Sequence, residues 1–188
     1  MERKKITEIC STEILHNSGL KILAGRPASG KTAYALKLAK ECAIDAQTPT
    51  AYFSMEMTSG QLMKRFVENT SEGYDANLYI DDSPSITVNE LCSKCRQMVD
   101  EQGVKMVIID YLQLMCKEEN HKRKEEMSAI LKSLYTLAKE VSISILALCQ
   151  RPCEQDGDMM SSLRGDFDIH TLEQYVDTII FLGYNDIK

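Results

Sequence analysis

The amino-acid sequence predicts an α/β fold in which helices cover both faces of a mainly parallel central sheet. Short apolar runs of strand length alternate with segments whose apolar residues recur at helical spacing, a pattern typical of parallel sheets with crossover helices. The run 104–110 (VKMVIID) is almost wholly apolar, as expected of a central strand covered on both faces. The 188 residues are enough for one well-buried domain and short for two.

The expected elements follow one another without an internal repeat or a low-complexity linker. Two capping boxes, Thr58-x-x-Gln61 and Thr87-x-x-Glu90, each precede an apolar stripe and predict helix starts. Further helices are expected over 33–39 and 127–138, the second after a charged run, 121–126, that we assign to a solvated first turn. The expected strands are 20–24, 50–54, 77–80, 104–110, 141–149 and 178–182, while 153–171 shows no clear periodicity.

The segment 25–32 (GRPASGKT) matches the phosphate-loop pattern G-x-x-x-x-G-K-[ST] at every fixed position. Its glycines let backbone N–H groups turn toward phosphate oxygens, and the following helix adds partial positive charge at its N-terminus. A plain glycine–serine turn is the alternative, which the flanking strand and helix disfavour. The motif predicts a nucleoside triphosphate site with Mg²⁺ as a cofactor, formed by Gly25, Arg26, Pro27, Ala28, Ser29, Gly30, Lys31, Thr32 and Ala33. The motif does not distinguish ATP from other triphosphates.

Three polar residues, Glu56, Asp110 and Gln150, fall at the carboxyl ends of expected strands. Ligands of open parallel sheets lie beyond these ends, so we expect the three side chains to meet beside the phosphate loop. Asp110 is expected to hold Mg²⁺ opposite the hydroxyl of Thr32, with a turn-capping aspartate as the alternative. Glu56 is expected to orient or deprotonate the attacking water unless it is an exposed loop glutamate, and Gln150 to contact the γ-phosphate.

Charge and cysteine content limit the possible classes of protein. The net charge of −6 provides no global basic field, so any nucleic-acid surface must be a local cluster. Seven scattered cysteines suit reduced thiols better than a disulfide framework, and we expect Cys92 and Cys95 to pack in a helix rather than bind zinc. No apolar run reaches the length of a membrane span and the N-terminus lacks a secretory apolar core, so a cytoplasmic location is expected.

Taken together, the motifs resemble the DnaB-type replicative helicases, whose motor domain has the RecA-like fold of the P-loop NTPases. The resemblance rests on GRPASGKTAYALKLA, AYFSMEMTSGQLMKRF, LYIDDSPSITVNEL, VIIDYLQLM, the strand end ALCQR, and SSLR with EQYVDTIIFL. It covers about residues 20–184 and is far more specific than a phosphate loop alone.

The resemblance implies a role for individual residues. Lys31 and Thr32 would lie at the phosphates and the magnesium ion, with Asp110 as the acid on the magnesium side. Glu56 would be the catalytic glutamate and Gln150 the γ-phosphate sensor. Arg65 resembles a family position near the nucleotide base, and Arg164, in SSLR, resembles the family loop that grips single-stranded DNA.

The sequence also departs from the family pattern. After Arg164 the family usually reads Glu-Ser-Gly, whereas this chain reads GDFDIHTLEQ, which is longer and more acidic, so weak DNA binding is expected of the isolated chain. We expect an amphipathic segment at 1–19 and the ATPase core at 20–188. The family's N-terminal collar domain and its C-terminal arginine-finger segment are not recognised, and weak catalysis by the isolated chain is therefore expected.

Two functions remain open on the sequence. The first is the ATP-binding core of a DnaB-like helicase that, when complete and assembled as a ring, moves along single-stranded DNA. The second is a stand-alone RecA-like regulatory module that binds ATP without unwinding DNA. The motif-by-motif match favours the helicase, while the acidic charge and the unrecognised finger and collar favour the module.

Overall fold

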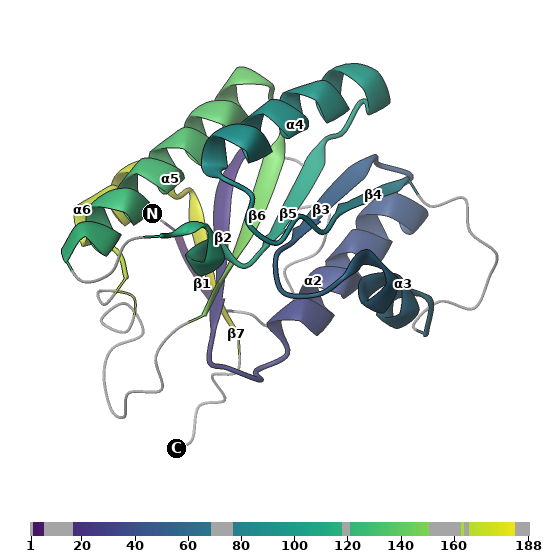
Figure 1. Cartoon of the computed structure of the whole chain (residues 1–188), viewed down its shortest axis with the longest axis horizontal. Coiled ribbons are helices and arrows are strands. Elements are labelled where there is room, and N and C mark those ends of the chain that lie inside the picture. The colour runs from purple at the N-terminus through teal and green to yellow at the C-terminus, as the bar shows by residue number, and fades with distance from the viewer. Residues whose placement is uncertain are drawn as a thin grey trace.

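Seven parallel strands form one sheet in the order β1-β7-β2-β6-β5-β3-β4 (Figure 1). The computed structural model describes residues 2–5, 17–68, 77–117, 121–150, 163 and 166–182. Its strands are β1 (Glu2–Lys5), β2 (Gly19–Gly25), β3 (Thr50–Ser54), β4 (Leu78–Asp81), β5 (Met106–Asp110), β6 (Ser144–Gln150) and β7 (Thr178–Leu182). The parallel α/β fold expected from the sequence is therefore confirmed.

The helices in the described residues connect successive strands. They are α2 (Lys31–Lys40), α3 (Ser59–Glu68), α4 (Val88–Gln102), α5 (His121–Glu140) and α6 (Ile169–Tyr175), with a π-helical turn at Glu41–Asp45 and a 3-10 turn at Leu112–Met115. The strand expected at 141–149 begins only at Ser144, because Ser142 adopts a positive φ of 52° in the turn after α5. Neither β1 nor α6 was predicted from the sequence.

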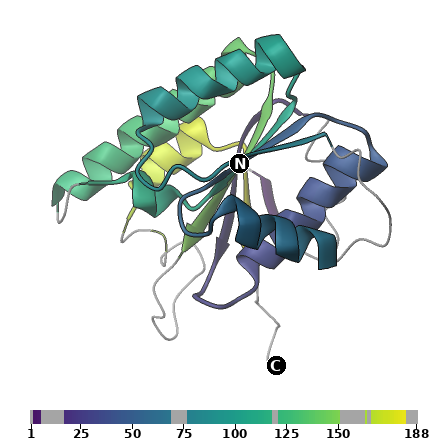
Figure 2. The ribbon, with the colours of Figure 1, turned by 45° about the vertical axis from the view of Figure 1, so that its right-hand side comes forward.

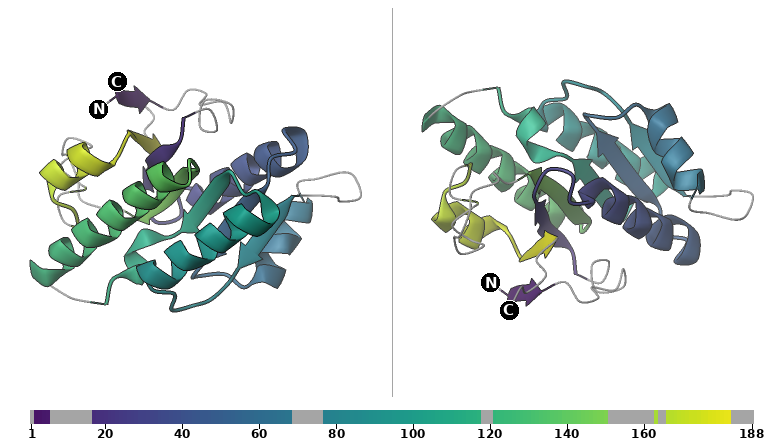
Figure 3. Two further views of the ribbon diagram at one scale, coloured as in Figure 1. Left: turned by 90° about the horizontal axis from the view of Figure 1, so that it is seen from above. Right: turned by 90° about the horizontal axis from the view of Figure 1, so that it is seen from below.

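Side chains of the central strands point alternately to the two faces of the sheet and divide the core into two clusters. Phe53 and Ile109 face the cluster that contains α4, α5 and α6, whereas Tyr52 and Ile108 face the cluster under α2 and α3. Figures 2 and 3 show these two helical layers on opposite sides of the strands. With both faces covered, the carboxyl edge of the sheet is left for a ligand.

Both predicted capping boxes are present. The Thr87 hydroxyl accepts a hydrogen bond from the Glu90 N–H at 3.3 Å, and the Glu90 carboxylate accepts one from the Thr87 N–H at 2.9 Å. At α3, the Gln61 side chain accepts from the Thr58 N–H at 3.1 Å. These contacts satisfy backbone donors that have no partner within the first helical turn.

Replacing Thr87 by alanine should lower the free energy of unfolding by about 1 kcal/mol, because the N-cap acceptor is lost. Urea denaturation would measure the change. Ser93→Ala is the matched control, since Ser93 is an exposed residue in the interior of the same helix, and it should shift stability by less than about 0.5 kcal/mol. Equal effects of the two substitutions would contradict the capping role.

The cysteine pair of α4 is part of the core. Cys92 is 6 % exposed and Cys95 is fully buried, and burial raises the pKa of both thiols, so the packing interpretation is confirmed. Within the described ranges, no group of three or more His, Cys, Asp or Glu side chains could hold a metal ion. Across the same residues, none of the helices combines the length and apolar character needed to cross a membrane.

Candidate nucleotide-binding site

A pocket of about 360 Å³ opens at the carboxyl edge of the sheet, where β2 enters the phosphate loop and β3, β5 and β6 end. It brings together the predicted residues Lys31, Thr32, Glu56, Asp110 and Gln150, although they come from four separate segments of the chain. The remaining lining residues are Pro27, Ala28, Ser29, Gly30, Ala33, Met57, Arg65 and Tyr111. Gly25 and Arg26, which were also predicted, do not line the pocket, but their carbonyl oxygens accept hydrogen bonds from Lys31.

The phosphate loop is held in a tight curl. Ala28 and Gly30 have positive φ angles of 56° and 86°, and Gly30 caps the N-terminus of α2. A side chain at Gly25 would place its Cβ 2.5 Å from the Ser29 Oγ, so a larger residue there would displace the Ser29 side chain. Ser29 Oγ is buried and has no hydrogen-bond partner within the described part of the chain, which leaves a polar atom ready for an acceptor or donor from a ligand.

Lys31 folds back over this loop. Its Nζ donates to the carbonyl oxygens of Gly25 at 3.0 Å and Arg26 at 2.7 Å. Burial lowers the pKa of Lys31, whereas the neighbouring Asp110, Cys149 and Glu56 act in the opposite direction. The ammonium is thus held against the loop that leads into the N-terminus of α2, and its charge together with the helix N-terminus favours an anion there.

Asp110 ends β5 as a buried carboxylate, 4 % exposed. Its Oδ2 accepts hydrogen bonds from the Thr32 hydroxyl and the Tyr52 hydroxyl, each at 2.9 Å. Burial raises the pKa of Asp110, and these two hydrogen bonds oppose the rise. Tyr52 was not predicted as a site residue, because it reads simply as an apolar position of a buried strand.

Glu56 lies in a turn that begins where β3 ends. The Ser54 hydroxyl accepts from the Met57 N–H at 3.1 Å and donates to the Met57 carbonyl at 2.7 Å, which closes the turn. The Met55 N–H donates to the Asp110 carbonyl at 2.9 Å and ties the turn to the end of β5. The Glu56 side chain is exposed and lines the pocket, where a water molecule could reach it.

Two arginines, Arg65 and Arg164, were also predicted as site residues. Arg65 reaches the pocket from α3, which fits its expected location near a nucleotide. Met57 and Tyr111 also line the pocket but were missed, although Tyr111 directly follows the strand-ending Asp110 and could have been found by that position. Arg164, the predicted DNA-binding residue, lies outside the described residues.

The residues present fit a magnesium–nucleotide complex. The curled loop offers N–H donors, the orphaned Ser29 hydroxyl and the Lys31 ammonium to phosphate oxygens. Thr32 and Asp110 are oxygen donors side by side, the ligand type that Mg²⁺ prefers.

The sheet, its carboxyl-edge pocket and the curled phosphate loop define a RecA-like ATPase domain of the P-loop class. Comparison with known proteins gives the family. The chain belongs to the DnaB-like helicase C-terminal domain family, whose model matches residues 10–73 and 68–188. The family expected from the sequence is thereby confirmed.

The chain is similar to curated replicative helicases. It is 35 % identical over 207 residues to the replicative DNA helicase DnaB of Geobacillus stearothermophilus, covering 93 % of this chain and 45 % of that protein. The Haemophilus influenzae replicative DNA helicase DnaB is 33 % identical, with coverage of 92 % and 44 %. The chain thus spans less than half the length of these relatives.

Two solved structures share the fold. One is the structure of an ATPase domain, which matches with a TM-score of 0.75 and 28 % identity, covering 97 % of this chain and 78 % of that one. The other is a DnaB-like replicative helicase, described with its interactions with primase, which matches with a TM-score of 0.74 and 29 % identity, covering 90 % and 49 %.

Proposed function

We propose that this chain is the ATP-hydrolysing motor of a replicative DNA helicase that, as a complete protein, assembles into a ring and moves along single-stranded DNA in the cytoplasm. The observation that carries the proposal is the meeting of Lys31, Thr32, Glu56, Asp110 and Gln150 around one pocket. Membership of the DnaB-like family and similarity to proteins named replicative DNA helicases support it.

In the proposed mechanism, the loop N–H groups and Lys31 bind the β- and γ-phosphates of ATP. Thr32 and Asp110, whose side-chain oxygens lie 2.9 Å apart, would hold Mg²⁺. A bound Mg²⁺ supplies positive charge that neutralises the phosphate oxygens.

Glu56 accepts a proton from the water that attacks the γ-phosphate, since its exposed carboxylate lines the pocket without being buried in the core. The Gln150 amide contacts a γ-phosphate oxygen, because an amide can donate to phosphate while accepting from water. Arg65 lies beside the nucleotide. Hydrolysis then removes the γ-phosphate that Gln150 contacts.

DNA binding is proposed to run through Arg164, whose guanidinium would contact a backbone phosphate. Arg164→Ala should weaken binding to every single-stranded sequence alike, since a phosphate contact carries no base information. The slope of log affinity against log salt should flatten by about 0.7, the value of one contact on a single strand. Fluorescence anisotropy over a salt series measures both effects.

Arg96→Ala is the control for this experiment, because Arg96 is paired with Glu140 on the outer surface of α4 and α5 at 2.8 Å. It should leave DNA affinity unchanged. Affinities on the non-specific scale of about 10⁻⁴ to 10⁻⁶ M are expected for the single chain. Tight binding that Arg164→Ala does not alter would place the DNA contact elsewhere.

A further inference from the structure

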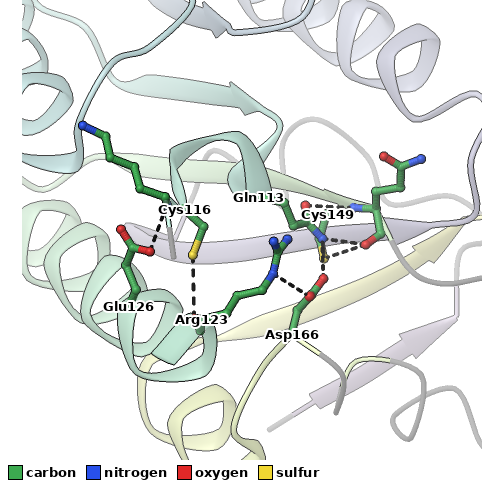
Figure 4. Close-up of polar contacts among 8 residues, drawn as sticks. Gln113, Cys116, Arg123, Glu126, Cys149 and Asp166 are labelled. Carbon is green, nitrogen blue, oxygen red and sulfur yellow. Dashed lines mark hydrogen bonds and ion pairs between the residues drawn. The ribbon is translucent and has the colours of Figure 1, made fainter. Parts of the chain in front are cut away.

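A polar network lies next to the nucleotide pocket, in a second cleft that shares Pro27, Tyr111 and Gln150 with it. Figure 4 shows the Gln113 amide beside Cys149 and Asp166, with Arg123 on the other side of Asp166. Gln113 comes from the 3-10 turn after β5 and is buried, 8 % exposed. Its side chain does not line the nucleotide pocket.

The Gln113 amide binds both main-chain polar groups of Gln150. Its Nε2 donates to the Gln150 carbonyl at 2.5 Å, and its Oε1 accepts from the Gln150 N–H at 3.2 Å. These two hydrogen bonds run in opposite directions between one side chain and one residue. Together they fix the position and the orientation of the Gln150 backbone.

The sheet explains why Gln150 needs such a partner. The pairing of β6 with β5 ends at Ala147, opposite Ile109, because the chain turns away after Asp110. On its other side, β6 stays paired with β2 as far as Gln150, opposite Gly25. The Gln113 side chain therefore takes the place of the missing strand neighbour at the last residue of β6.

The orientation of Gln113 is itself held by charge. Its Nε2 lies 3.2 Å from the Asp166 carboxylate, and Asp166 accepts from the Arg123 Nε at 3.0 Å. A carboxylate can only accept, so Asp166 distinguishes the NH₂ end of the Gln113 amide from its carbonyl end. Arg123, from α5, in turn holds Asp166.

We propose that Gln113 is the positioning residue for the γ-phosphate contact of Gln150, with Asp166 and Arg123 fixing its orientation. This inference rests on the sensor role of Gln150 in the proposed function. When Gln113 is lost, the end of β6 keeps only its β2 neighbour, and the Gln150 side chain no longer points reliably at the γ-phosphate. Binding of the diphosphate portion of the nucleotide does not involve this contact.

The test is the ratio of two affinities, measured by calorimetry with Mg²⁺ for ADP and for a non-hydrolysable ATP analogue. Gln150→Ala should lower the preference for the triphosphate about tenfold, equivalent to about 1.4 kcal/mol. Gln113→Leu should lower it by a similar factor while ADP affinity stays unchanged, which also shows that the variant is folded. Gln113→Glu keeps the side-chain size but cannot donate to the Gln150 carbonyl, and should behave likewise.

The double variant Gln113→Leu with Gln150→Ala should lose no more preference than either single variant, because both remove the same contact. Gln97→Leu is the control, since Gln97 is an exposed glutamine of α4 bonded to Glu101 at 2.9 Å, and it should keep the wild-type ratio.

Normal preference in Gln113→Leu beside a loss in Gln150→Ala would overturn this inference and leave the proposed function standing. Additive losses in the double variant would also overturn it. An unchanged preference in Gln150→Ala would remove the sensor role on which the inference depends. A wild-type chain that binds neither nucleotide would instead overturn the proposed function, and the inference with it.

Discussion

Glu56→Gln should lower kcat for ATP hydrolysis by about 10²- to 10⁴-fold, the usual contribution of a general base. Glutamine keeps the shape of the side chain but cannot accept the proton of the attacking water. Because Glu56 is exposed and makes no contact that closes its turn, the fold and the phosphate loop should be unaffected. ATP affinity should therefore stay at the wild-type value.

The measurement pairs steady-state phosphate release with calorimetric ATP binding, in whichever assembled form of the protein turns over. Glu101→Gln is the control, because Glu101 is an exposed carboxylate on α4 away from the pocket. An unchanged rate of hydrolysis in Glu56→Gln would mean that another residue is the general base.

Lys31→Ala should weaken ATP binding at least tenfold, or by about 1.4 kcal/mol. The Lys31 ammonium is a cation that lines the pocket and is held directly against the loop carbonyls of Gly25 and Arg26. Its loss removes a charge-assisted contact to the β- and γ-phosphates.

Calorimetry with ATP tests this directly, and Lys37→Ala serves as the control. Lys37 is on the same helix but its side chain is 70 % exposed and faces Glu41 rather than the pocket. Equal ATP affinity in Lys31→Ala and the wild type would contradict the assignment of the phosphate loop.

Local patterns in the sequence predicted much of the fold. Apolar runs that end on a polar residue predicted the locations of β3, β5 and β6. Because ligands of parallel sheets lie beyond the carboxyl ends of the strands, the same runs predicted that Glu56, Asp110 and Gln150 lie at one pocket. The capping boxes located α3 and α4, since the capping residues act within four positions of each other. Such features depend on nearest neighbours along the chain and are visible without a structure.

Features that depend on distant partners were missed. The strand β1 consists of Glu-Arg-Lys-Lys and has no apolar alternation, so only its pairing with β7 reveals it. Helix α6 has seven residues and a single buried position, Leu172. The contact of Tyr52 with Asp110 spans 58 positions and joins the paired strands β3 and β5. The contact of Gln113 with Gln150 spans 37 positions and lies beyond the last pair of β5 and β6.

The most direct test of the central claim is ATP turnover with and without single-stranded DNA. If the chain is the motor of a helicase, ATP hydrolysis should rise when single-stranded DNA is added, and Glu56→Gln should abolish this hydrolysis. The wild type and the variant should both still bind ATP. ATP binding accompanied by turnover that DNA does not change would contradict this account and support the regulatory module instead.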